Sequence, residues 1–160
     1  MKHVVALTLA ALLVAAVGCG GSDDPLPDVT EQITLLQGDD EDGRWAALKN
    51  LQWLGPKGME AVAPLRSLLR TTRDDDLRAE IAQTLAALGP SAAAAAPEVM
   101  PLLDSKEAWT RTCAAEALGG MGQAAIPAWT KLVALTRDRD PDVAEAATEA
   151  VRRLRRLKKK

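Results

Sequence analysis

The fold is decided by the stretch Arg78-Ala-Glu-Ile-Ala-Gln-Thr-Leu-Ala-Ala-Leu-Gly89, because similar stretches occur both before and after it in the chain. The upstream copy reads Arg44-Trp-Ala-Ala-Leu-Lys-Asn-Leu-Gln-Trp-Leu-Gly55, and the downstream copy reads Arg111-Thr-Cys-Ala-Ala-Glu-Ala-Leu-Gly-Gly-Met-Gly122. The closing glycines lie 34 and then 33 residues apart, and a further step of 33 from Met121 reaches Leu154, inside a degraded fourth copy. A fixed period of about 20–50 residues indicates stacked repeats rather than one globular core.

Each copy is predicted to form an amphipathic helix. In the central copy Ile81, Leu85 and Leu88 are four and three residues apart, which places them on one face of a helix. The other copies carry the equivalent apolar residues Leu48, Leu51 and Leu54; Ala114, Leu118 and Met121; and Ala147, Val151 and Leu154. Glycine commonly stands just past a helix end, so the closing glycines mark the helix ends.

The residues before these helices predict their caps. Asp42, Asp76 and Asp142 stand two residues before the register of Arg44, and an Asp there is expected to accept bonds from free amides at the helix start. The third copy has Trp109 at this register, so Asp104 or Ser105 is expected to cap its helix instead.

A second helix is predicted after each closing glycine, approximately over 61–70, 94–103 and 126–136. Each contains a proline (Pro64, Pro97 or Pro127) near its start, where the missing N–H costs little. Residues 27–37 match the second helix of a half repeat, which would cap the N-terminal end of the stack. The predicted fold is all-α: a short α-solenoid of helical hairpins, with about three full repeats plus half-repeat caps at both ends.

The repeat unit resembles the short HEAT repeats of the phycobilin-lyase-like type. The resemblance lies in the order of its parts: an acidic cap, an Arg, the pattern Ala-Ala-x-x-Leu-x-x-Leu-Gly, and then a helix entered through a proline. The best match is 76–103, and the pattern covers roughly 28–157. Tetratricopeptide repeats expect Tyr and Phe, which this chain lacks, and ankyrin repeats expect a Thr-Pro-Leu-His turn. The resemblance implies the fold, but it leaves the function open, because such repeats serve many roles.

Residues 1–18 are predicted to be a signal peptide that is removed. Lys2 supplies a positive charge, and the apolar run 4–17 is shorter than the about 20 residues that span a bilayer. The run ends in Ala16-Val17-Gly18-Cys19, which resembles a bacterial lipoprotein signal, in which the cysteine is lipidated and becomes the mature N-terminus. The alternatives are an uncleaved membrane anchor and an ordinary signal peptide with an incidental cysteine.

The lipoprotein resemblance implies an exported chain held by Cys19 at the bacterial cell envelope, on the periplasmic side or the cell surface. Residues 19–27, rich in Gly, Pro and Asp, are then the lipidated cysteine and a flexible tether. The HEAT-like repeat domain occupies 28–157, and 158–160 form a basic tail. The expected membrane contact is through the N-terminal lipid.

The residue inventory argues against an enzyme. The one histidine, His3, lies in the predicted signal peptide, and no Tyr, serine-nucleophile motif or glycine-rich phosphate loop occurs. Cys113 is interpreted as a small residue packed between helices rather than a reactive thiol. The acidic runs 39–42 and 74–76 lack the ligand spacing of a calcium loop. We therefore expect no catalytic residue, cofactor, metal or small-molecule substrate.

Two sets of side chains are candidates for partner contact. Tryptophan is enriched among interface hot spots, so Trp45, Trp53 and Trp109 are candidate anchors, with packing against a neighbouring turn as the alternative, and Trp129 is assigned to the core. Second helices usually line the concave face of HEAT arrays, and by this analogy Arg66, Arg70 and Glu98 would lie near a binding groove.

Charge is distributed unevenly along the chain. Residues 19–151 carry 22 acidic and 12 basic side chains, so this exported body is not expected to bind nucleic acid. The end of the chain is basic and is a candidate for contact with an anionic surface, through Arg152, Arg153, Arg155, Arg156, Lys158, Lys159 and Lys160. The alternative is a solvated outer face on a terminal helix.

Arg44, Arg78 and Arg111 recur at one register and could form an anion-binding stripe. The resemblance favours structural pairing with neighbouring Asp caps and turn carbonyls.

These observations favour a non-catalytic exported lipoprotein that acts as a scaffold or adaptor for an unidentified protein partner. One alternative is an envelope spacer that binds anionic surfaces through its basic C-terminal helix. A lyase-like accessory protein is the other alternative.

Overall fold

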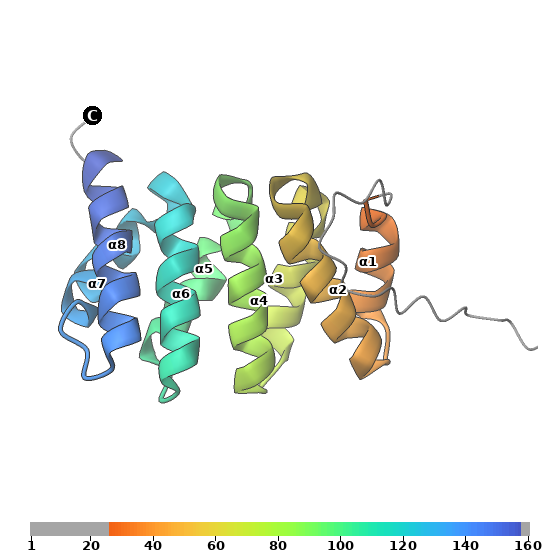
Figure 1. Cartoon of the computed structure of the whole chain (residues 1–160), viewed down its shortest axis with the longest axis horizontal. Coiled ribbons are helices and arrows are strands. Elements are labelled where there is room, and N and C mark those ends of the chain that lie inside the picture. The colour runs from red at the N-terminus through yellow and green to blue at the C-terminus, as the bar shows by residue number, and fades with distance from the viewer. Residues whose placement is uncertain (1–25, 158–160) are drawn as a thin grey trace, which may run out of the picture.

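The computed structural model describes residues 26–157, and this part of the chain contains helices and turns but no strand (Figure 1). The predicted signal peptide, Cys19 and the basic tail 158–160 lie outside the described residues. The α-helices are α1 (Val29–Gln37), α2 (Glu41–Leu54), α3 (Val62–Thr71), α4 (Asp75–Leu88), α5 (Ala96–Val99), α6 (Ala108–Gly120), α7 (Trp129–Leu135) and α8 (Pro141–Leu157). Four 3₁₀ segments join them: η1 (Gly55–Ala61), η2 (Gly89–Ala95), η3 (Met100–Asp104) and η4 (Gly122–Ala128).

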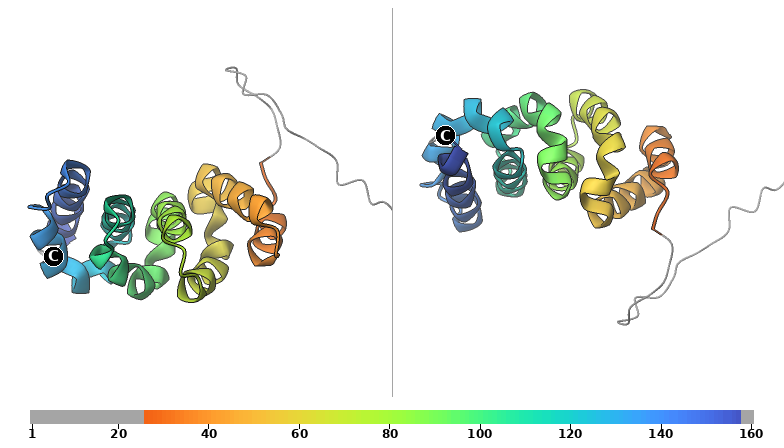
Figure 2. Two further views of the ribbon diagram at one scale, coloured as in Figure 1. Left: turned by 90° about the horizontal axis from the view of Figure 1, so that it is seen from below. Right: turned by 90° about the horizontal axis from the view of Figure 1, so that it is seen from above.

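The helices form two rows that follow a shallow arc (Figure 2). We call α2, α4, α6 and α8 the inner row, because they lie on the inner side of the arc, and α1, α3, α5 and α7 the outer row. The analogy with HEAT arrays expected the second helices, now the outer row, on the concave side; the structure has the first helices there. The all-α solenoid predicted from the repeats is confirmed.

The same turn ends the first helix of each full repeat. Gly89 has φ of +59°, a left-handed conformation that side chains with a Cβ rarely adopt, and Gly55 and Gly122 share it. Pro56 and Pro90 follow the first two of these glycines and help to set the 3₁₀ turn that leads into the outer row. The repeat period therefore arises from a local backbone requirement.

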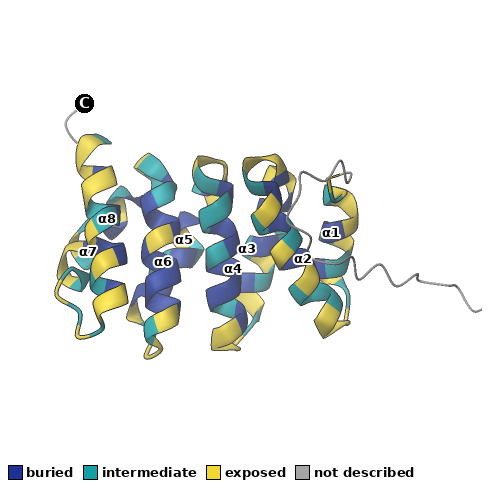
Figure 3. Cartoon of the chain, in the orientation of Figure 1, coloured by how far each residue is buried: buried dark blue, intermediate teal, exposed yellow. Residues whose placement is uncertain are grey.

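The core lies between the two rows and is built from the predicted stripes. Leu51, Leu85 and Leu118 stand at one register of three successive repeats, and each is fully buried. The middle helices α4 and α6 are buried on several sides, whereas α1 and α8 at the ends of the stack bury one face (Figure 3). Each repeat covers its neighbour, as expected for a linear array.

The helix caps differ from those predicted. Asp74 caps α4, because its Oδ1 accepts from the amides of Asp76 and Leu77, and Asp40 and Asp140 take the same position before α2 and α8. The predicted caps, Asp42, Asp76 and Asp142, lie inside the first turn instead, where they complement the helix dipole. Neither Asp104 nor Ser105 caps α6, which starts after Glu107 without a side-chain cap.

The second helices match the prediction unevenly. The helix predicted over 61–70 is α3, shifted by one residue. The helix predicted over 94–103 is broken into η2, α5 and η3, because Pro97 and Pro101 each lack the N–H that a continuous helix needs. The helix predicted over 126–136 begins only at Trp129, since η4 continues past Pro127.

Candidate interaction surface

The three arginines at one register bind turn carbonyls. Arg44 donates to Gly38 O at 2.8 Å, and Arg78 donates to Thr72 O at 3.1 Å. Arg111 donates to Ser105 O at 2.9 Å. Of the two interpretations of this register, the structure therefore supports structural pairing, because each guanidinium ties the start of a first helix to the turn before it.

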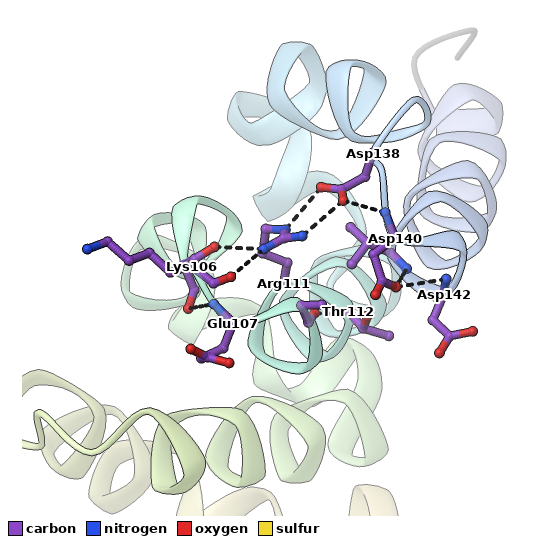
Figure 4. A network of polar contacts seen from close by, with 10 residues as sticks. Lys106, Glu107, Arg111, Thr112, Asp138, Asp140 and Asp142 are labelled. Carbon is purple, nitrogen blue, oxygen red and sulfur yellow. Dashed lines mark hydrogen bonds and ion pairs between the residues drawn. The ribbon is translucent and has the colours of Figure 1, made fainter.

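Arg111 also binds a carboxylate in the next inter-repeat turn, a contact that the other two lack (Figure 4). Its Nε and NH2 donate to the two carboxylate oxygens of Asp138, at 3.0 and 2.9 Å, and both side chains are about nine-tenths buried. This guanidinium, helped by the Asp140 amide, holds the pKa of Asp138 below its usual range. Since Asp140 caps α8, the network joins two successive inter-repeat turns.

Arg66, Arg70 and Glu98 lie together on the outer row. Arg66 donates from Nε and NH2 to both carboxylate oxygens of Glu98, at 3.1 and 2.8 Å, and Arg70 donates to the same carboxylate at 3.1 Å. The Arg66 guanidinium is the main cause of the lowered pKa of Glu98. These side chains pair with one another across α3 and α5, two neighbouring helices of the outer row.

The four tryptophans fall into two groups. Trp45 and Trp129 are partly buried and pack against the core. Trp53 and Trp109 are large apolar side chains left in solvent, 62% and 53% exposed, and both project from inner-row helices. The candidate anchors with free surface are therefore Trp53 on α2 and Trp109 on α6.

A groove runs between α6 and α8 and has a volume of about 530 Å³. Trp109, Thr112 and Glu116 line its α6 side. The side chains that line it on α8 are polar or small: Asp142, Glu145, Ala146, Glu149, Ala150 and Arg153. Thus Trp109 borders a hollow surface, while Trp53 lies two helices away along the row.

The floor of this groove is made of small residues. A Cβ placed on Gly119 would lie 3.0 Å from Ala150 Cβ and 2.9 Å from its Cα, and the second distance is closer than real Cβ atoms come. Only glycine therefore allows α6 and α8 to approach at this point. Because Gly119, Ala146 and Ala150 carry little or no side chain, the space above them stays open.

The corresponding surface between α2 and α4 is occupied by paired polar side chains. Lys49 Nζ lies 2.7 Å from a carboxylate oxygen of Glu80, which also accepts from Gln52. Gln52 further donates to Thr84 Oγ1 at 3.2 Å. This polar cluster joins the two helices where α6 and α8 leave a groove.

The basic end of α8 is partly neutralised by its own helix. Arg152 and Arg153 each lie within 2.8 Å of a Glu149 carboxylate oxygen, and these two guanidinium groups lower the pKa of Glu149 to about 2. Arg155 and Arg156 are exposed. Lys158, Lys159 and Lys160, from the predicted anionic-surface contact, lie outside the described residues.

Three further features bear on function. Cys113 is fully buried, and burial raises the pKa of its thiol to about 12. Within 26–157, no cluster of three or more His, Cys, Asp or Glu side chains is arranged to hold a metal ion. In the same range, no helix has the length and apolar character needed to cross a membrane.

Glu116 and Glu145 were not singled out by the sequence analysis, yet both line the groove. A signal for Glu116 was present in the repeat register, because residues 49, 83 and 116 are equivalent and change from Lys to Gln to Glu. The groove itself depends on contacts between helices, which a comparison of the repeat sequences does not show.

The chain matches the HEAT-repeat family over residues 29–96 and 62–152 and therefore belongs to it. Two engineered proteins of known structure are each 22% identical to the chain with a TM-score of 0.68; the matches cover 80% and 79% of this chain and 62% and 63% of theirs. The complex of CpcE and CpcF of phycocyanin lyase from Nostoc sp. PCC7120 is 25% identical with a TM-score of 0.63, over 88% of this chain and 58% of that one. The chain thus spans less than two thirds of each of these proteins. No curated protein matches it significantly.

Proposed function

We propose that this HEAT-repeat chain is an exported, lipid-anchored adaptor without catalytic activity, and that it binds a partner protein on the inner row of its solenoid. The observation that carries the proposal is the α6–α8 groove with Trp109 at its border, 53% exposed. A large aromatic side chain beside a hollow is typical of an interface anchor.

Several observations support a protein partner. HEAT repeats build extended surfaces suited to macromolecules. The similar phycocyanin lyase structure is a complex of two chains, CpcE and CpcF. On the outer row, by contrast, Arg66, Arg70 and Glu98 satisfy one another, which leaves them less available to a partner.

The lipid anchor and the location are proposed from the N-terminal sequence. Cys19 follows the apolar run 4–17, and the resemblance to a lipoprotein signal implies attachment there. The short segment between Cys19 and α1 would keep the solenoid close to the membrane surface, on the periplasmic side or outside the cell. Metabolic labelling with a radioactive fatty acid would test this, since a Cys19→Ala variant is expected to carry no label.

Crosslinking in the native envelope tests the adaptor function. The wild-type chain should capture a discrete protein, and Trp109→Ala should lose most of that product. Trp53→Ala is the comparison variant: it removes the other exposed tryptophan of the inner row, which lies outside the groove, and should lose much less of the product.

The envelope spacer remains the second candidate, because Arg155 and Arg156 are exposed at the end of α8. It predicts diffuse, salt-sensitive capture that Trp109→Ala leaves unchanged and that truncation after Val151 abolishes. That result would contradict the adaptor proposal.

A further inference from the structure

We propose that the α6–α8 groove accepts an Arg- or Lys-rich segment of the partner, with a cationic side chain of that segment lying against Trp109. This inference rests on the proposed function and specifies the chemistry of the partner. Three independent features of the groove carry it: its charge, its aromatic border and its open floor.

The groove is strongly acidic. Four carboxylates line it, those of Glu116, Asp142, Glu145 and Glu149, against the single guanidinium of Arg153. Within residues 26–157, Glu149 is paired with Arg152 and Arg153, while the other three carboxylates form no ion pair. Unpaired like charges gathered in a concave site attract a ligand of opposite charge.

The position of Trp109 suits a cation. Trp109 and Glu116 line the α6 side of the groove, and Asp142 and Glu145 line its α8 side. A guanidinium or ammonium over an indole face gains a cation–π interaction, and tryptophan is the best partner for it. Arginine can stack its planar group on the ring while it donates hydrogen bonds to carboxylates.

The floor leaves room for such a side chain. Gly119, Ala146 and Ala150 line the bottom, and the volume of about 530 Å³ lies in the usual ligand-pocket range of about 300–1,000 Å³. The aliphatic stem of Arg or Lys can lie along these apolar surfaces, with its charged end among the carboxylates. Size, aromatic contact and charge therefore favour the same ligand.

Fluorescence anisotropy of the purified full chain tests the inference. The probe is a fluorescein-labelled peptide of six Arg and six Ala residues, and the comparison peptide has Glu in place of Arg. The Arg peptide is expected to bind and the Glu peptide is not. Glu116→Gln/Glu145→Gln should weaken binding about tenfold at low salt, and Trp109→Ala should weaken it roughly three- to tenfold.

The matched control is Asp39→Asn/Asp42→Asn, which removes the same number of charges from the exposed acidic run at the start of α2. This double variant should change the affinity less than twofold. An equal loss in both double variants would overturn the inference, because it would show attraction by net charge alone.

The two proposals can fail separately. If the envelope partner is captured through Trp109 but the Arg peptide does not bind, the adaptor function stands and the cationic ligand is wrong. If the Arg peptide binds in the groove but no discrete protein is captured in the envelope, the groove chemistry stands and the adaptor function is wrong.

Discussion

The two ends of the inner row use equivalent positions for different purposes. Lys49 and Glu116 occupy one repeat register, and so do Gln52 and Gly119. At the N-terminal end Lys49 and Gln52 both contact Glu80 and join α2 to α4. At the C-terminal end Glu116 and Gly119 line an open groove together with Glu149 and other α8 residues. The surface between α2 and α4 is therefore closed by paired polar side chains, whereas the equivalent surface between α6 and α8 stays open.

The arginine register shows the same asymmetry and yields the largest expected effect. Arg111→Ala removes a nine-tenths buried partner of Asp138 and should lower the free energy of unfolding by about 3–5 kcal/mol. Arg44→Ala, which loses a bond to the Gly38 carbonyl at a half-buried site, should cost only about 1 kcal/mol. Urea denaturation of both variants measures the difference; equal losses would contradict the distinction between the two ends.

The two adjacent glycines of α6 should respond in opposite directions. Gly119→Ala places a Cβ against Ala150 and should destabilise the fold by about 1–3 kcal/mol. Gly120→Ala meets Gly89 Cα at an ordinary 3.6 Å and should be neutral or stabilising by up to about 1 kcal/mol, because alanine favours a helix. Thermal unfolding followed by circular dichroism compares them. A neutral Gly119→Ala would show that α6 and α8 can separate without cost.

The Arg111–Asp138 pair should also make stability depend on pH. The pKa of Asp138 is lower in the folded chain than in the unfolded chain, so the unfolded state takes up its proton first on acidification. The contribution is thus fully present above the unfolded pKa of about 3.9 and is lost as the pH falls through the folded value. Asp138→Asn should therefore be less stable than wild type at pH 7, and this difference in the free energy of unfolding should shrink as the pH approaches 2. Denaturation at several pH values checks this; a constant difference would refute it.

The smallest expected effects concern the equivalent positions 49 and 116. Lys49→Gln removes a partner of buried Glu80, but because Lys49 is mostly exposed the loss should stay below about 1 kcal/mol. Glu116→Gln removes a carboxylate that lies near Asp142 and Glu145 without an ion pair of its own, so stability should be unchanged or slightly higher. Chemical denaturation at low salt gives both values, and a clear loss in Glu116→Gln would show that the groove carboxylates contribute to folding.

The fold could be predicted largely from the sequence, whereas in the candidate site only Trp109 was predicted as a partner anchor and the groove was not. Leu51, Leu85 and Leu118 were predicted to share a core stripe, and all three are buried. The helix caps were predicted two residues too late. Comparing the repeats shows where acidic residues recur, but it does not show at which residue the backbone becomes helical. The second helix of the middle repeat was predicted as continuous, although Pro97 and Pro101 break it.

The sequence by itself determined the helical hairpins and their order in this protein. Those features depend on interactions within a few residues: the apolar spacing of Ile81, Leu85 and Leu88, and a left-handed φ, as at Gly89, that only glycine adopts easily. The tertiary structure alone decided which row lines the inner side of the arc, which ions are paired, and where a groove stays open. These depend on how closely neighbouring helices approach, as Gly119 and Ala150 do, and that distance follows from packing across repeats rather than from any one segment.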